Sequence, residues 1–360
     1  MDSCKSCKGR RRVSGSMSML RGEPFVYATR GERIESVHDV AACIADADGH
    51  VLRALGDIDE PVFLRSSVKP FIAADVVACG AATRFGFDAR ELAVMAASHN
   101  GESFHVAAVE SILAKIGVDA GALQCGAQVP SYEPAAKALA ATGAPATALH
   151  NNCSGKHAGI LAMCVHLGFD LRTYLALEHP AQQRILGFCA RILGQRVEDL
   201  PLGIDGCGIP VFATSLRHAA RAFARFATLA SLDDADAAAL VTVRAAMVAE
   251  PAYVGGSERF DSALLVATGG RVVGKAGAEG VHADALCREG LGLVLKVVDG
   301  ARRAVPPATM ALLAAAGALE APEVAALERF ARPQIRNVAG HLVGFVESSP
   351  SDTTSAIVTS

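Results

Sequence analysis

The chain reads Arg65-Ser66-Ser67-Val68-Lys69-Pro70 immediately before an apolar run that begins at Phe71. Proline is tolerated in the first turn of a helix, so this pattern predicts a helix that begins near Ser66. Residues three apart share a helix face, and we therefore expect the side chains of Ser66 and Lys69 to meet. Lysine, unlike arginine, can lose its proton when it is desolvated. A buried Lys69 beside a serine hydroxyl would be a candidate general base.

Two further motifs follow in a fixed order. Ser98-His99-Asn100 comes after a predicted alanine-rich helix, and Lys275-Ala276-Gly277 ends an apolar predicted strand. Ser-x-x-Lys, then Ser-x-Asn, then Lys-x-Gly on a strand is the motif order of serine β-lactamases and penicillin-binding proteins. The order favours an α/β (α+β) fold like theirs, with a mixed, mostly antiparallel sheet flanked by helices. Taken singly, the motifs have simpler explanations, namely a solvated Lys69, a helix-capping Ser98 and an exposed strand end at Lys275.

Hydrophobic periodicity outlines the rest of the architecture. Residues 27–57 have a β pattern, and Asp46-Ala47-Asp48-Gly49 predicts a hairpin between residues 40–45 and 50–55. Helical spacing of apolar residues predicts helices at residues 68–79, 90–97, 105–116, 181–193, 235–248 and 306–319. Short apolar runs predict strands at residues 264–267, 271–275, 292–298 and 340–346. Because strands occur at both ends of the chain with helices between them, we expect the terminal strands to share one sheet.

Composition limits the kinds of protein to which this chain can belong. The 360 residues are 51% hydrophobic and 20% charged, which allows a sizeable core, and no apolar run reaches about 18 residues, so we expect no membrane partner. A net charge of −3 argues against nucleic acid as a partner. We expect residues 1–20 to form a disordered N-terminal tail, residues 21–350 a single catalytic domain and residues 351–360 a C-terminal tail. Ten cysteines without a dense disulfide framework predict reduced thiols and a cytoplasmic location.

Two cysteines lie in polar, glycine-rich stretches. Residues 151–159 read NNCSGKHAG and residues 205–208 read DGCG. The Gly-Lys pair resembles a phosphate-binding loop, but the upstream glycine is missing and His157 stands where Ser or Thr would bind magnesium. Cys153 and Cys207 each lie in a predicted glycine-rich turn, where two thiolates and a third donor would suit zinc. The alternative is two unrelated buried cysteines.

Taken together, these motifs resemble the asparaginase II family, the class 3 or Rhizobium etli-type L-asparaginases. The resemblance runs from about residue 32 to residue 346 and also includes Lys275-Ala276-Gly277-Ala278-Glu279-Gly280 and Arg336-Asn337. It implies a fold like that of serine β-lactamases and glutaminases, a homodimer, and hydrolysis of L-asparagine to aspartate and ammonia. The long N-terminal tail with its cysteines departs from the family pattern.

The resemblance also implies roles for individual residues. Two Ser-Lys pairs around one cleft would be the catalytic residues Ser66, Lys69, Ser98 and Lys275. The implied zinc ligands, completed by water, are Cys153, Lys156 and Cys207. The residues expected to bind substrate are Arg65, Asn100, Asp205 and His157. Arg65 is either a substrate anchor or half of a structural ion pair.

The expected reaction is acyl transfer. Lys69 would deprotonate Ser66, which attacks the side-chain amide of asparagine, and Ser98 with Lys275 would relay a proton to the departing ammonia. The sequence does not fix which serine attacks, and Ser98 is the alternative nucleophile. Because this serine machinery is complete, we expect one zinc ion per chain to tune substrate binding and not to be the catalytic Lewis acid.

Two other interpretations stay open at the level of sequence. The first is another serine hydrolase on the same scaffold, either a glutaminase or a β-lactamase-like enzyme, because one methylene changes binding by only about 1–3 kcal/mol. The second is a non-catalytic protein that responds to zinc or redox state through Cys153, Cys207 and the Cys4/Cys7 pair. Ammonia release from asparagine, glutamine and a chromogenic β-lactam separates these interpretations.

Overall fold

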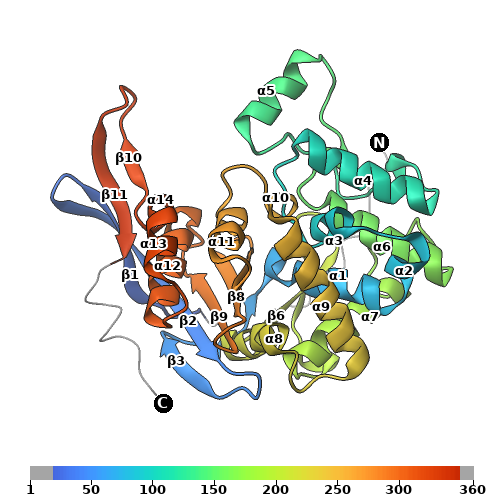
Figure 1. The fold of residues 1–360 in the computed structure, drawn as a ribbon, viewed down its shortest axis with the longest axis horizontal. Helices are drawn as coiled ribbons and strands as arrows, with labels where there is room; N and C mark the ends of the chain where they lie inside the picture. Colours follow the sequence, from blue (N-terminus) through green and yellow to red (C-terminus); the bar gives the residue numbers. More distant parts are fainter. Residues whose placement is uncertain (1–18, 349–360) are drawn as a thin grey trace, which may run out of the picture.

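The computed structural model describes residues 19–348, so the Cys4/Cys7 pair and nearly all of the two expected tails lie outside the described residues. The described part is a mixed α+β fold in which helices cover an antiparallel sheet (Figure 1). The strands are β1 (Glu23–Arg30), β2 (Arg33–Ala45), β3 (Val51–Leu55), β4 (Val62–Phe63), β5 (Leu202–Ile204), β6 (Pro210–Thr214), β7 (Val272–Ala276), β8 (Val281–Leu286), β9 (Leu291–Val297), β10 (Gln334–Arg336) and β11 (Leu342–Ser348). The α-helices are α1 (Lys69–Ala78), α2 (Ala81–Phe85), α3 (Ala89–Met95), α4 (Ser103–Ile116), α5 (Glu133–Ala141), α6 (Ser154–Leu167), α7 (Pro180–Leu193), α8 (Leu216–Thr228), α9 (Asp234–Ala249), α10 (Pro251–Val254), α11 (Phe260–Thr268), α12 (Val305–Ala315), α13 (Ala321–Ala326) and α14 (Glu328–Ala331).

The main sheet joins the two ends of the described chain. Its strand order is β10-β11-β1-β2-β9-β8-β7, with β3 paired to β2, and the neighbouring strands are antiparallel. The pairing of β1 with β11 confirms that the terminal strands share a sheet, and the β2–β3 pair confirms the predicted hairpin. A second, three-stranded sheet has the order β4-β6-β5 and was not predicted.

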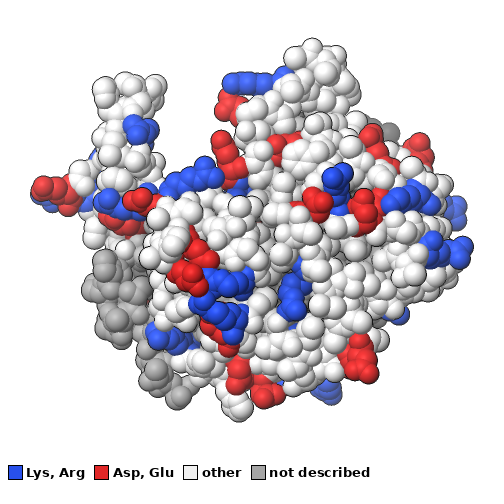
Figure 2. All heavy atoms as spheres, in the orientation of Figure 1, with Lys and Arg blue, Asp and Glu red and all other residues white. Residues whose placement is uncertain are grey.

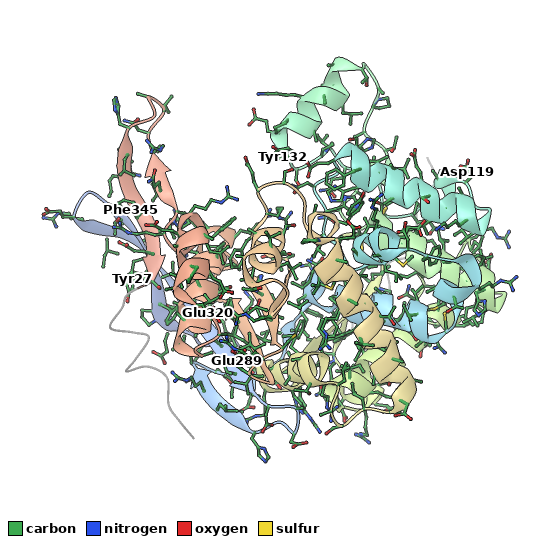
Figure 3. All side chains as sticks on the ribbon, viewed as in Figure 1. Tyr27, Asp119, Tyr132, Glu289, Glu320 and Phe345 are labelled. Carbon is green, nitrogen blue, oxygen red and sulfur yellow. The ribbon has the colours of Figure 1, made fainter. Side chains whose placement is uncertain are left out.

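Strand β2 shows why the sheet has helices on both faces. Side chains alternate between the two faces of a strand. One hydrophobic cluster takes the side chains of Ala41, Cys43 and Ala45 and includes residues of α1 and α8. The other cluster takes the intervening Val40, Ala42 and Ile44 and includes residues of α12. Because both faces of β2 are apolar, this strand is buried between two layers of helices, and side chains fill the space between the layers (Figure 3).

Helix α1 lies at the centre of the helical part of the molecule. Its residues from Lys69 to Val76 are all buried, as expected for a helix that is surrounded by others. The ring of Phe71 packs against Phe223 and Phe226 of α8, with ring centroids 5.2 and 5.8 Å apart. This packing fixes the start of α1, and with it Ser66 and Lys69, between the sheet and the helices.

Two local predictions are wrong. Residues 264–267 belong to helix α11 and not to a strand, because Phe260, Leu264 and Leu265 are buried at helical spacing and a four-residue apolar run does not distinguish the two. No helix was predicted between residues 116 and 181, whereas α6 begins at Ser154, within the polar stretch at residues 151–159. Gly155 serves close packing: a Cβ there would clash with the Val94 carbonyl of α3.

Two elements project from the body of the molecule. Helix α5 and the β10–β11 hairpin extend on the same side, and the outline is hollowed between them (Figures 1 and 2). On the face shown, positive and negative side chains are interspersed (Figure 2). Arg288 pairs with both Glu289 and Glu320, which ties the β8–β9 turn to the start of α13 (Figure 3). Within residues 19–348, every helix is too short or too polar to span a lipid bilayer.

Candidate active site

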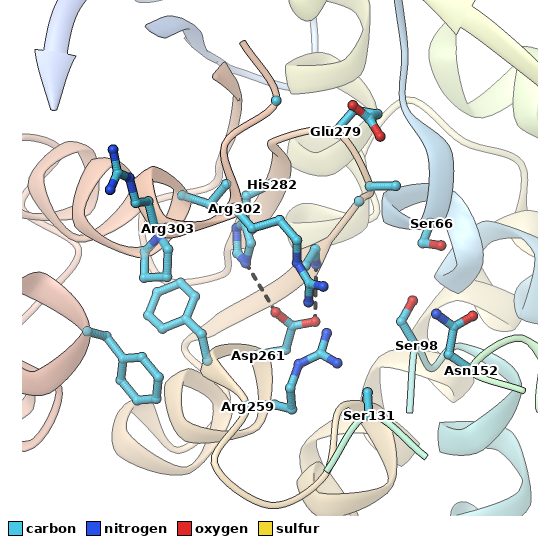
Figure 4. A pocket seen from close by; sticks show the side chains of 18 of the residues that line it. Ser66, Ser98, Ser131, Asn152, Arg259, Asp261, Glu279, His282, Arg302 and Arg303 are labelled. Atoms are coloured by element: carbon cyan, nitrogen blue, oxygen red, sulfur yellow. Dashed lines mark hydrogen bonds and ion pairs between the residues drawn. The ribbon is translucent and has the colours of Figure 1, made fainter. Parts of the chain in front are cut away.

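A cavity of about 650 Å³ opens between the sheet and the helices. Its wall combines residues from the start of the chain's helical part with residues of β7, β8 and α11, and Figure 4 shows Ser66 and Ser98 facing it from one side. The polar residues that line it are Ser66, Ser98, Gln128, Ser131, Asn152, Glu258, Arg259, Asp261, Glu279, His282, Arg302 and Arg303. A volume of this size accommodates an amino acid amide together with water.

Ser98 lies where two buried amines meet. It follows α3, and its Oγ is 3.1 Å from Lys69 Nζ and 3.1 Å from Lys275 Nζ. Both lysines are almost fully buried. Lys69 Nζ also lies 2.6 Å from the Ala97 carbonyl and 3.2 Å from that of Asn152. Two lysines from distant stretches of the sequence therefore both contact the Ser98 hydroxyl.

The predicted contact between Ser66 and Lys69 takes a different form. Residues Arg65–Val68 form a 3₁₀ turn that leads into α1, and the two side chains line one small cavity of about 20 Å³. Within residues 19–348, the Ser66 hydroxyl has no hydrogen-bond partner, because the amine of Lys69 is directed at Ser98 instead. Ser66 Oγ is thus free and open to both cavities.

The glycine of the Lys-x-Gly motif has a packing explanation. A Cβ at Gly277 would lie 2.6 Å from the carbonyl oxygen of Leu64, two residues before Ser66. The end of β7 therefore approaches the Ser66 segment closely only because residue 277 has no side chain. This contact sets the spacing between Lys275 and the serines.

Lys275 has an anionic partner on α11. Its Nζ lies 3.3 Å from Asp261 Oδ2, and both groups are buried. Burial lowers the pKa of Lys275 to about 8, although the charge of Asp261 opposes the shift. Burial alone would raise the pKa of Asp261, but the charges of Lys275 and His282 hold it far below its usual range.

Behind Asp261 lie two further buried ionisable groups on β8. His282 Nε2 is 3.4 Å from Asp261 Oδ1, an ion-pair distance without hydrogen-bond alignment, and His282 Nδ1 is 3.0 Å from Asp284 Oδ2. Burial lowers the pKa of His282, but the charge of Asp284 and the contacts with Asp261 outweigh it and raise the pKa to about 9. His282 is therefore protonated at neutral pH.

The three expected zinc ligands come together next to the small cavity. Cys153 precedes α6, Lys156 lies in its first turn, and Cys207 lies in the turn between β5 and β6. Lys156 Nζ donates to Cys207 Sγ at 2.9 Å. A hydrogen bond from Cys207 lowers the pKa of Cys153 well below its usual value despite burial, helped by the charges of Lys156 and Lys69.

This donor set fits zinc. Two sulfur atoms in a buried site match the ligand preferences of the ion, and the amine of Lys156 would be an unusual third donor. Among residues 19–348, no three His, Cys, Asp or Glu side chains form a metal site, so the expected site depends on the lysine. Lys156 must lose its proton to bind metal, whereas the cysteines raise its pKa, against the effect of burial.

Arg65 and Asp205 form an ion pair beside Ser66. Arg65 Nη2 lies 2.6 Å from Asp205 Oδ1, and both residues line the small cavity. Arg65 has a φ of 54°, a left-handed conformation that is unfavourable for a residue with a side chain. Such strain persists only where surrounding contacts impose it, and it occurs preferentially at functional sites. The ion pair is one contact that holds it.

None of the four residues expected at the substrate lines the large cavity, and Asn100 and His157 line neither cavity. Asn100 is buried, and its side chain donates to the Ser257 carbonyl and accepts from Ser131 and Arg259. His157 is buried in α6, where its Nδ1 lies 2.7 Å from the Tyr174 hydroxyl. The structure therefore gives both side chains hydrogen-bond partners within the protein, and their expected contacts with substrate stay predictions.

Sequence reasoning assigned no role to several charged residues of the site: Arg259, Asp261, His282, Asp284 and Arg302. One signal for them was present. Residues His282 and Asp284 are two apart in a stretch that is otherwise apolar, VHADAL, so both charges fall on the same face of a buried strand. Asp261 carried no such signal. It lies in the first turn of α11, and residues 264–267 of that helix were predicted to form a strand.

The comparisons with known proteins point to one family. A family model described as L-asparaginase II matches residues 26–348. No curated protein sequence matches the chain. Similar solved structures include Mglu in its native form (16% identity, 78% of this chain and 65% of that chain, TM-score 0.34) and Mglu in its glutamate form (14% identity, 73% and 56%, TM-score 0.33). The match thus spans less than two thirds of the length of these proteins, and TM-scores this low do not establish a shared fold.

Proposed function

Because the chain belongs to the L-asparaginase II family, whose members are amidohydrolases, we propose that it hydrolyses the side-chain amide of L-asparagine to aspartate and ammonia. The observation that carries the proposal is the Ser98 hydroxyl held between Lys69 and Lys275, 3.1 Å from each amine, beside the free hydroxyl of Ser66. Amide hydrolysis needs a nucleophile, a base and a proton donor for the leaving nitrogen, and this cluster offers all three.

The proposed nucleophile is Ser66. Its hydroxyl is free, it faces the cavity, and it lies at the start of a helical segment, where unpaired N–H groups can hold an oxyanion. Lys69 is the proposed base. Two carbonyl oxygens, those of Ala97 and Asn152, accept its hydrogens as a neutral amine, which leaves its lone pair for a serine hydroxyl. That hydroxyl is Ser98's in this structure, so the proposal requires Lys69 to turn toward Ser66 during the reaction. Ser98 and Lys275 are the proposed proton relay to the leaving ammonia.

Arginines on the cavity wall suit the substrate's α-carboxylate. The Arg302 side chain lines the cavity and has no hydrogen bond or ion pair within residues 19–348, and the Arg259 side chain makes one hydrogen bond, at 3.2 Å to Asn100. Figure 4 shows both guanidinium groups on the side of the cavity that faces the serines. Arg65, the expected anchor, is paired with Asp205. We therefore assign carboxylate binding to Arg302 and Arg259, and to Arg65 and Asp205 the support of Ser66.

Zinc, if bound by Cys153, Lys156 and Cys207, would supply a fixed positive charge behind the small cavity. Purified without chelator, the wild type should contain about one zinc ion per chain. Cys153→Ser should remove it, whereas Cys287→Ser should keep it, because Cys287 lies far along the chain on the β8–β9 turn. Equal zinc content in the three proteins would contradict the site.

Trapping the acyl-enzyme tests the mechanism directly. We expect wild type to release ammonia from asparagine, and Ser66→Ala and Ser98→Ala each to lose several orders of magnitude in kcat. Mass spectrometry of quenched turnover should place an aspartyl ester on Ser66. Wild-type turnover in Ser66→Ala would rule out this nucleophile, and an ester on Ser98 would exchange the roles of the two serines.

Glutamine is the second substrate to test. The cavity of about 650 Å³ easily accepts one more methylene, so its size does not exclude the longer amide. Parallel ammonia assays with both amides give the ratio of kcat/KM values.

A β-lactamase-like scaffold, a homodimer and a cytoplasmic location remain part of the proposal. The non-catalytic interpretation is set aside, because the family is one of enzymes.

A further inference from the structure

A line of buried ionisable side chains runs from Ser98 into the cavity wall. Lys275 connects Ser98 to Asp261, with distances of 3.1 and 3.3 Å. Asp261 is 3.4 Å from His282, which is 3.0 Å from Asp284. The four ionisable residues are each at most 1% exposed. Burying charges costs free energy, and a protein with well-packed apolar residues in their place is often equally stable or more stable. A role in the site therefore explains these four buried charges better than a contribution to stability does.

The neighbouring strand leaves room for this line. Gly274 of β7 lies directly opposite Asp284 in the β7–β8 register, and a Cβ there would lie 2.5 Å from Asp284 Oδ1. That oxygen has no hydrogen-bond partner among the described residues. An unpaired carboxylate oxygen is a further cost, which a wall built for stability alone would avoid.

The charges along the line alternate in sign. Asp284 and Asp261 are acidic, and His282 and Lys275 are basic, so each group has an opposite charge as its neighbour. Lys69 on α1 and Arg259 at the start of α11 also face Lys275, and both favour loss of its proton. The negative charge of Asp261 has the opposite effect and favours the protonated form of Lys275. The protonation of Lys275 therefore depends on the carboxylate of Asp261.

We propose that Asp261, held in place by His282 and Asp284, is a positioning residue that keeps Lys275 protonated and directed at Ser98, so that Lys275 supplies the proton for the leaving ammonia. This inference rests on the proposed amide hydrolysis. It also gives the two lysines different roles, Lys275 as proton donor and Lys69 as base, since Lys69 has no comparable carboxylate partner among the described residues.

Each proton that is transferred in acylation is restored by the end of one turnover. In acylation, the Ser66 oxygen bonds to the amide carbon, Lys69 takes the Ser66 proton, and the carbon–nitrogen bond breaks. The Ser98 hydroxyl gives its proton to the departing nitrogen, which leaves as ammonia, and Lys275 replaces that proton and becomes neutral. In deacylation, water bonds to the acyl carbon and returns a proton through Ser98 to Lys275. Lys69 then returns its proton to the Ser66 oxygen.

Asp261→Asn tests the inference because it removes the charge and keeps the shape. Losing an adjacent negative charge lowers the pKa of a cation, so the alkaline limb of the pH–rate profile, near pH 8 in wild type, should move down by about one pH unit or more. Glu320→Gln is the control. It removes an exposed carboxylate that pairs with Arg288 outside this line, so the limb should stay within a few tenths of a unit.

A direct titration separates this inference from the proposed function. Lysine labelled with ¹³C at Cε gives eight signals for the eight lysines of the chain, and Lys275→Arg identifies one of them. The Lys275 signal should titrate at lower pH in Asp261→Asn than in wild type. An unchanged titration would overturn the inference even if asparagine is hydrolysed. A shifted titration in a protein that releases no ammonia would overturn the proposed function and leave the role of Asp261 standing.

A second variant covers the case in which Asp261→Asn does not fold. His282→Gln removes the positive group behind Asp261 and leaves both carboxylates, so the Lys275 signal should titrate at higher pH than in wild type. A downward shift, or none, would contradict the proposed line of charges.

Discussion

Ser98 shows how single residues acquire a role from contacts that are distant in sequence. Its hydroxyl meets an amine 29 residues away and another 177 residues away. The sequence identified these three residues, because lysine is scarce in this chain and the motifs occur in a known order. It did not identify their partners. Asp261 is recognisable only through its 3.3 Å contact with Lys275, and residue spacing carries no information on that contact.

Arg302 provides a test of substrate recognition at the residue scale. If its guanidinium binds the α-carboxylate, Arg302→Ala should raise KM for L-asparagine by about 10- to 100-fold, because a hydrogen bond to a charged group contributes about 1.5–3 kcal/mol. The same variant should not change the kinetics with 3-aminopropanamide, which is asparagine without its α-carboxylate. Steady-state ammonia release with both compounds measures the difference.

The control for this experiment is Arg302→Lys, which keeps the charge but not the fork of donors and should recover part of the affinity for asparagine. An equal loss with both compounds would show that Arg302 supports the cavity and does not bind the carboxylate.

At the scale of elements, the sequence predicted the helices with clear apolar periodicity and missed α6, whose first turn is polar. Residues 105–116 and 181–193 are helical as predicted, because their apolar residues recur at helical spacing over three turns. Helix α6 was not predicted, because Gly155 and the surrounding polar residues look like a loop. Its glycines are explained only by the approach of α3, which is a tertiary contact.

Gly277→Ala tests the spacing between β7 and the Ser66 segment. The added methyl group would lie 2.6 Å from the Leu64 carbonyl, so one of the two segments must move. Overpacking of this kind costs about 1–3 kcal/mol. We expect a lower free energy of unfolding and a loss of at least about 10-fold in kcat, because a displacement of about 1 Å disrupts catalytic geometry. Denaturant unfolding and ammonia assays check the two parts, and unchanged kcat would show that this contact does not position the serines.

Gly155→Ala tests the packing of α6 on α3. Alanine normally stabilises a helix interior by about 1 kcal/mol relative to glycine, but here its methyl group would clash with the Val94 carbonyl. We expect a lower melting temperature and a lower zinc content, because Cys153 and Lys156 flank this position. Gly187→Ala in α7 is the matched control, since nothing lies within 4 Å of the added Cβ, and it should raise the melting temperature. The packing role would be wrong if both variants were equally stable.

At the scale of the whole molecule, the sequence anticipated the sheet better than the site. Strands at both ends of the chain predicted that the terminal strands would share one sheet, and β1 and β11 are indeed neighbours in it. What sequence could not provide was the path of the helical part between β3 and β7, which brings α1, α3 and α6 against one another. The cavity lies where that part meets the sheet, so its complete lining emerges only from the folded chain.

The buried line of charges also predicts how global stability depends on pH. The pKa of His282 is about 9 in the folded protein and about 6.5 when exposed. A raised pKa contributes stability that is complete below pH 6.5 and is lost as the pH rises toward 9. Between pH 6.5 and 8 the loss amounts to about 2 kcal/mol, at 1.36 kcal/mol per unit. The lowered pKa of Cys153 contributes to the pH dependence with the opposite sign, so wild type alone does not isolate the effect.

The difference between wild type and His282→Gln does isolate it. Groups that titrate alike in both proteins cancel, so the stability advantage of wild type should shrink by about 2 kcal/mol from pH 6.5 to pH 8. Lys275 adds little within this window, because its pKa is about 8 in wild type and the variant raises it. Urea unfolding of both proteins at constant ionic strength measures the difference at each pH. A difference that stayed constant or grew with pH would mean that His282 is neutral in the folded protein, and the alternating charges behind Lys275 would then not exist.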